Sequence, residues 1–174
     1  ATILGAINAA ADLGYQSKLE EANALLAKTA DQFPKEAMLR WHVAATYFLI
    51  GRGYKDEETQ AVMYRRGIEH AKVCLEVSPD TPDCWLAYAA LLGSLSLAEG
   101  IIDTISAMEE VNSSLHKAYE LSSQDPYPLG PYGIDSKHVA TGGIAEFYRL
   151  VPDWWIFGVL AGVRGDKAKA WEYA

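Results

Sequence analysis

The stretch YRRGIEHAKVCLEVSPDTPDCWLAYAALLG, residues 64–93, contains a helical pattern that stops and restarts within a few residues. Apolar residues recur at helical spacing up to Val77, the segment SPDTPD follows, and an apolar run led by Trp85 begins at once. Proline cannot continue a helix, and Pro82 stands where the first turn of a new helix tolerates it. The stretch therefore predicts two helices joined by a sharp turn.

The same arrangement recurs at a spacing of 44 residues, because Trp41 and Trp85 each open a helical pattern after a break. Three positions at i, i+3 and i+6 precede each break and form one stripe on a helix. In the three copies the stripe consists of Ala27, Ala30 and Phe33, of Ala71, Cys74 and Val77, and of Leu115, Ala118 and Leu121. The small members let a neighbouring helix approach closely. We therefore expect a bulky residue at Ala71 or Ala118 to cost on the order of several kcal/mol by overpacking.

These repeated pairs predict an all-α fold, a right-handed superhelical solenoid of about three to four tetratricopeptide-like helical hairpins. We expect a single domain over residues 1–174, in which one helix ends near residue 94 and the next begins near residue 98. The chain starts at Ala1 and ends inside a helical pattern, which we interpret as part of a longer chain. The expected segments are helix pairs near 2–33, 37–77 and 82–121, an irregular aromatic loop over 122–137, and an incomplete last pair over 138–174 that includes a helix near 154–163.

Composition excludes several classes of function. The formal net charge is -8, which argues against nucleic acid and against an anionic membrane surface as partners. No apolar run reaches the roughly 20 residues that span a bilayer, so no transmembrane segment is predicted. The sequence predicts a protein whose partners are other proteins or apolar molecules.

Residues that could carry catalysis or hold a metal are scattered. Asp135 and His138 have the i, i+3 relation of a metal pair, but no third ligand follows at helical spacing. We therefore predict no catalytic residue, no metal and no cofactor, and an enzyme built on this pair is the less favoured alternative. Cys74 and Cys84 lie in no CxxC pattern. Two buried thiols are the favoured interpretation, and a disulfide in an oxidising compartment is the alternative.

The sequence resembles the tetratricopeptide-like regulator of microtubule dynamics family and its bacterial relatives. The resemblance is carried by VMYRRGIEHAKVCL at 62–75, by the Trp-led helix, and by AEGIIDTISAMEEVNSSLHKAYELSSQDP at 98–126. The first of these segments is also similar to the T-component proteins associated with TRAP transporters. The resemblance implies an α-helical array that acts in binding or scaffolding, and it implies no shared catalytic residues. It also favours the periplasm or the cell envelope, with the cytoplasm as the alternative.

We predict a non-enzymatic scaffold or adaptor, a subunit of a larger assembly or a homo-oligomer, that binds a protein partner. If Trp41 faces its paired helix, the first helices of each pair present a weakly polar groove. The predicted partner-binding residues are His42, Thr46, Leu49 and Leu86 in that groove, and Tyr127, Tyr132, Trp154 and Trp155 in or beside the aromatic loop. The alternative function is a periplasmic carrier of a small apolar ligand or lipid that serves a transporter.

Overall fold

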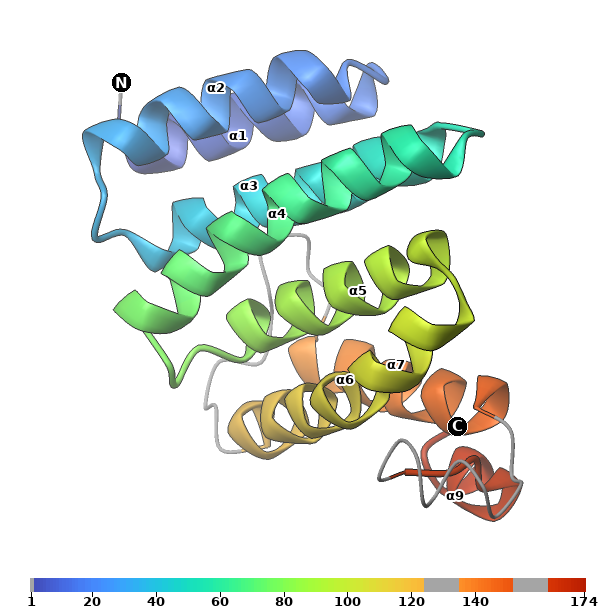
Figure 1. Ribbon diagram of the computed structural model, residues 1–174. Helices are drawn as coiled ribbons and strands as arrows, with labels where there is room; N and C mark the ends of the chain where they lie inside the picture. Colours follow the sequence, from blue (N-terminus) through green and yellow to red (C-terminus); the bar gives the residue numbers. More distant parts are fainter. Residues whose placement is uncertain (1, 124–134, 152–162) are drawn as a thin grey trace.

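The computed structural model describes residues 2–123, 135–151 and 163–174, and these residues form helices and no strand. The first three pairs follow the sequence prediction closely (Figure 1). The helices are α1 (Ile3–Tyr15), α2 (Leu19–Gln32), α3 (Ala37–Gly53), α4 (Glu57–Val77), α5 (Pro82–Glu99), α6 (Ile101–Ser122), α7 (Ser136–Leu150) and α9 (Lys167–Glu172). The expected helix near 154–163 lies outside the described residues.

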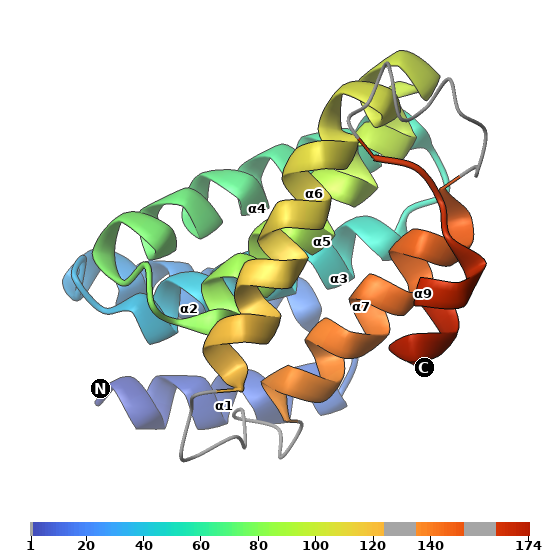
Figure 2. The same cartoon turned by 90° about the horizontal axis from the view of Figure 1, so that it is seen from below.

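The helices pack as consecutive pairs, so the predicted all-α array of helix pairs is confirmed (Figures 1 and 2). Each helix also contacts the next one along the chain, from α1 through α7. In addition, the odd-numbered helices α1, α3, α5 and α7 contact one another in sequence. Within the described residues α2 does not contact α4, and α4 does not contact α6. The odd-numbered helices therefore form the tighter, inner row of the stack.

The repeated stripe lies where the pairs pack. Its central members Ala30, Cys74 and Ala118 are all fully buried, as the repeat predicts for equivalent positions. Its last members behave differently, because Phe33 and Val77 each remain 38% exposed at the ends of α2 and α4. The other members are buried or half-buried: Ala27, Ala71, Leu115 and Leu121. The first two positions of the stripe are thus covered by neighbouring helices, and the third is partly exposed.

The turn between α4 and α5 is closed by a covalent bond. Cys74 and Cys84 are both fully buried and form a disulfide across a Cα–Cα distance of 5.6 Å. This corrects the favoured interpretation of two thiols. The residues 44 positions earlier are Ala30 and Arg40, and the Arg40 guanidinium donates a hydrogen bond of 3.2 Å to the Ala30 carbonyl oxygen. A disulfide at one turn and a hydrogen bond at the equivalent turn therefore join the same pair of repeat positions.

We expect reduction of this disulfide to lower the free energy of unfolding by about 2.5 kcal/mol, because it removes a constraint on a short loop of the unfolded chain. The loop is short, since the two cysteines are only 10 residues apart. The measurement is urea unfolding followed by circular dichroism, with and without a phosphine reductant. The Cys74→Ala/Cys84→Ala double variant is the control, because its stability should not respond to the reductant. Two titratable thiols in the untreated, denatured protein would contradict the bridge.

One glycine allows a close approach at the centre of the stack. A Cβ atom placed on Gly67 of α4 would lie 2.6 Å from a methyl group of Leu91 and 3.1 Å from the Cβ of Tyr47. Leu91 is fully buried and cannot move aside without disturbing its own packing. The absence of a side chain at Gly67 is therefore what lets α4 sit against both α3 and α5.

Candidate functional site

The inner row presents a stripe of α3 that no neighbouring helix covers fully. Its members recur at three- to four-residue spacing, so they share one side of the helix. We call it the open stripe, and it consists of Met38, Trp41, Ala45, Leu49 and Arg52. Met38 is 41% exposed and Leu49 is 46% exposed, whereas Leu39 and Val43 on the opposite side are fully buried. The open stripe is an apolar surface that ends in one cation.

His42 and Thr46 do not belong to this surface, which corrects their predicted place in an open groove. Both are buried, and Thr46 faces α2. The Asn23 amide of α2 donates hydrogen bonds to the Thr46 hydroxyl, at 3.0 Å, and to the Val43 carbonyl oxygen, at 3.2 Å. These bonds fix the rotation of α3, in which the half-buried Trp41 is part of the open stripe.

His42 is a buried structural residue of α3. Its ring stacks on that of Trp41 with 3.9 Å between the ring centroids. Burial, which disfavours the charged imidazolium, lowers the pKa of His42 to about 4. The imidazole is therefore neutral at neutral pH.

Leu86 is also less open than predicted. It is half-buried and packs with Ala89, Leu115, Ile144 and Tyr148, which come from α5, α6 and α7. Helix α7 thus covers the part of α5 that the sequence assigned to a groove. Farther along α5, Leu97 is 66% exposed, and no sequence argument had singled it out. Tyr127, Tyr132, Trp154 and Trp155 lie outside the described residues.

The open residues could have been found from the sequence by a different choice of helix face. Met38, Ala45 and Leu49 recur at seven- and four-residue intervals, a spacing that defines one side of a helix. The predicted groove instead depends on the assumption that the large side chain of Trp41 points at its paired helix. Because one residue corresponds to about 100° of helix rotation, that assumption placed the buried His42 and Thr46 on the predicted surface, whereas Leu49, which was predicted there too, is exposed.

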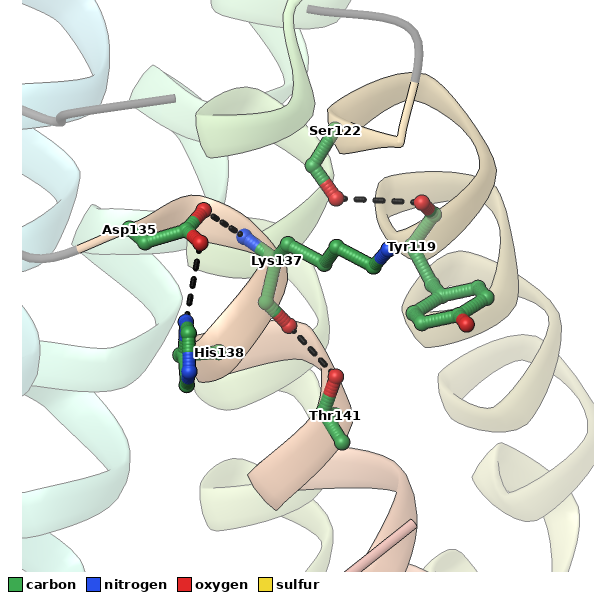
Figure 3. A network of polar contacts seen from close by, with 6 residues as sticks. All are labelled: Tyr119, Ser122, Asp135, Lys137, His138 and Thr141. Carbon is green, nitrogen blue, oxygen red and sulfur yellow. Dashed lines mark hydrogen bonds and ion pairs between the residues drawn. The ribbon is translucent and has the colours of Figure 1, made fainter.

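Asp135 and His138 begin helix α7 and have a local structural role (Figure 3). One carboxylate oxygen of Asp135 accepts a hydrogen bond of 2.8 Å from the backbone N–H of Lys137, and the other lies 2.8 Å from His138 Nδ1. This is the geometry of a helix N-cap, which satisfies an otherwise unpaired amide. The hydrogen bond to His138 is the main cause that lowers the pKa of Asp135, and the hydrogen bond from the Lys137 backbone N–H lowers it further.

The rest of this network joins α7 to α6. The Lys137 ammonium lies 5.5 Å from the centroid of the Tyr119 ring on α6, a cation–π contact (Figure 3). The Thr141 hydroxyl donates to the Lys137 carbonyl oxygen, and the Ser122 hydroxyl donates to that of Tyr119. Among the described residues no group of three or more His, Cys, Asp or Glu side chains is placed to hold a metal ion. The network explains Asp135 and His138 as the start of a helix.

Within the same described ranges no helix has the length and apolar character to cross a membrane.

A model of the family described as Regulator of microtubule dynamics protein 1-3 matches residues 7–134, which is well over half of the chain. No curated protein matches the sequence. The matched segment runs from within α1 through α6 and includes the open stripe and the disulfide. The chain belongs to the Regulator of microtubule dynamics protein 1-3 family.

Proposed function

We propose that this protein is a non-enzymatic scaffold that binds another protein along the inner row of its helices. The observation that supports the proposal is the exposed apolar surface on that row, in which Leu49 of α3 and Leu97 of α5 are 46% and 66% exposed. Exposed apolar patches rimmed by polar residues mark protein interaction sites more often than chance. Arrays of helix pairs use such extended faces for binding.

The residues that could have supported an enzyme have other roles. Asp135 caps α7, and His42 is buried on α3 against the Trp41 ring. His70 Nδ1 lies 3.3 Å from the Arg40 guanidinium, and it must accept that hydrogen bond because arginine only donates. Each of these groups has a structural role within a helix or between helices, which favours a binding function over catalysis.

The proposed compartment is the cell envelope. Disulfides form and persist in oxidising compartments and are rare in the cytosol. The Cys74–Cys84 bridge supports such a compartment, and so does the resemblance to the T-component proteins. In this proposal the chain is one subunit of an assembly at the envelope.

The experiment is site-specific photocrosslinking in the cells that make the protein. A benzophenone amino acid at position 49 or 97 should give a covalent adduct with the same partner protein, because both positions lie on the inner row. Lys72, an exposed residue of α4, is the matched control position and should give no such adduct. The proposal fails if positions 49 and 97 give no adduct, or if position 72 gives the same one.

A further inference from the structure

The first helix pair is attached to the rest of the described chain through α3 alone. Helices α1 and α2 lie at one end of the stack (Figure 1), and of the other described helices they contact only α3. The apolar core divides in the same way. The cluster that contains Leu26, Leu39 and Val43 takes all of its buried members from α1, α2 and α3, whereas the next cluster takes its members from α3, α4 and α5. A boundary between two cores therefore runs along α3.

The side chain of Arg40 on α3 links the two sides of this boundary. Its guanidinium donates a hydrogen bond of 3.2 Å to the Ala30 carbonyl oxygen of α2, and another of its nitrogens lies 3.3 Å from His70 Nδ1 on α4. Only an unprotonated Nδ1 can accept from a guanidinium, so this contact requires a neutral His70 ring. The same ring stacks on Tyr47 of α3, which packs against the first core. His70 thus supports, from α4, two side chains of α3 that contact that core.

The surroundings of Arg40 offer little to compensate a second positive charge. The Arg40 side chain is only 11% exposed, and its Nε is buried without a hydrogen-bond partner among the described residues. In the same part of the chain its paired carboxylate is that of Asp31 on α2, which is 3.7 Å away and 76% exposed. Water weakens an ion pair of this kind. A proton on His70 would place two cations 3.3 Å apart in a site that water barely reaches, where their repulsion is poorly screened.

The titratable and charged groups around His70 come from three helices. Arg40 and Tyr47 belong to α3, Asp31 to α2 and Glu69 to α4, and no charged group of the described part of α5 contributes. Burial and Arg40 lower the pKa of His70, and the two carboxylates act in the opposite direction without cancelling them. An open state in which His70 leaves Arg40 and meets water relieves both causes. Such a state binds a proton more readily than the closed one, so a falling pH favours opening.

We propose that protonation of His70 releases the first helix pair from α3, so that α1 and α2 open as one unit at mildly acidic pH while α3 to α6 stay folded. The equivalent joint one repeat later cannot respond in this way, because the Cys74–Cys84 disulfide takes the place of the hydrogen bond from Arg40. Opening uncovers Leu39 and Val43, which are fully buried in the closed state. This regulation goes beyond the scaffold function and does not depend on it.

The test is hydrogen–deuterium exchange of the whole chain at pH 7.5 and pH 5.5, read by mass spectrometry. Each rate is divided by the intrinsic chemical rate at the same pH, which gives a protection factor. Protection in α1 and α2 should fall together on acidification, because a local opening exposes a whole unit. Protection of residues 61–92 in α4 and α5 should fall less. An equal loss in all helices, or no loss in α1 and α2, would overturn the proposal.

The variant His70→Gln makes the test specific, because glutamine keeps a hydrogen-bond acceptor and does not titrate. At pH 5.5, one unit below the ordinary pKa of histidine, a single histidine changes an opening equilibrium by at most about tenfold. The measured quantity is the ratio of α2 protection at pH 7.5 to that at pH 5.5, which we expect to be about two to ten times smaller in the variant than in the parent. His42 titrates in both proteins and cancels from the comparison.

The matched control is His138→Gln, which removes an exposed histidine on α7, a helix that does not contact α1 or α2. This variant should keep the ratio of the parent protein. Because the ratio is taken within each protein, a variant that is less stable at both pH values still decides the question. A parent-like ratio in His70→Gln, or the same reduction in His138→Gln, would show that His70 does not control the opening.

Discussion

Replacing Ala30 with leucine is expected to lower the free energy of unfolding by about 3 kcal/mol, because overpacking a close-packed seam forces side chains and backbone to shift. Ala30 is fully buried on α2, where it packs with Leu26, Leu39 and Val43. Its carbonyl oxygen also accepts the hydrogen bond from Arg40, so a displaced α2 would lose that contact as well.

The matched control lies two turns away on the same helix. Ala24 is exposed, so Ala24→Leu adds the same atoms where there is room for them. Alanine and leucine have similar helix propensities, and the change at this position should therefore stay within about 0.5 kcal/mol. Urea unfolding monitored by circular dichroism measures both variants. Equal stabilities of the two would show that the repeated stripe is not a packing seam.

The repeat made most of the fold predictable from the sequence. Proline-marked breaks and a 44-residue period located the first three pairs, because helix ends depend on local chemistry that the sequence shows directly. The turn between α5 and α6 was placed too early, near residues 94–98. Gly93 lies inside α5, where a glycine is tolerated, and the helix continues to Glu99. The chain turns instead at Gly100, whose φ of 121° is open to glycine and strained for other residues.

The candidate site was less predictable, because it depends on contacts between distant residues. The rotation of α3 is fixed by Asn23, which lies 23 residues before its hydrogen-bond partner Thr46. Nothing in the local sequence of α3 reveals that bond, and a rotation by one residue exchanges His42 for Trp41 at the surface. The packing of α7 over Leu86 is likewise a contact between residues that are distant in the sequence. Local patterns predicted the elements, and tertiary contacts decided which faces remain open.

Acidification is expected to destabilise the protein between pH 6.5 and pH 4 by up to about 3 kcal/mol through His42 alone. The folded state holds the pKa of His42 at about 4, below the 6.5 of an exposed histidine. Between these values the unfolded chain binds more protons than the folded one, so stability rises with pH. The contribution of His42 is fully present above pH 6.5 and is lost as the pH falls towards 4.

His70 also contributes stability that is lost as the pH falls. Burial and the nearby Arg40 lower its pKa, since a protonated ring could no longer accept the hydrogen bond of the guanidinium. The carboxylates affect the stability of the fold only at lower pH. The pKa values of Asp135 and Glu146 are lowered by hydrogen bonds to His138 and Arg149, so the stability they supply is present above about pH 4.5 and falls only below it. The window from pH 4.5 to pH 6.5 therefore reports mainly on the two histidines.

The measurement is the free energy of urea unfolding at pH 4.5, 5.5, 6.5 and 7.5, for the parent protein and for His42→Leu. Leucine fills the buried site without titrating, so the variant should show a shallower rise of stability with pH, whatever its stability at pH 7.5. A separate titration of the imidazole resonances locates the ionisation of His42 directly. If that ring titrates near pH 6.5 in the folded protein, burial does not disfavour its charge, and the burial assigned to His42 on α3 is wrong.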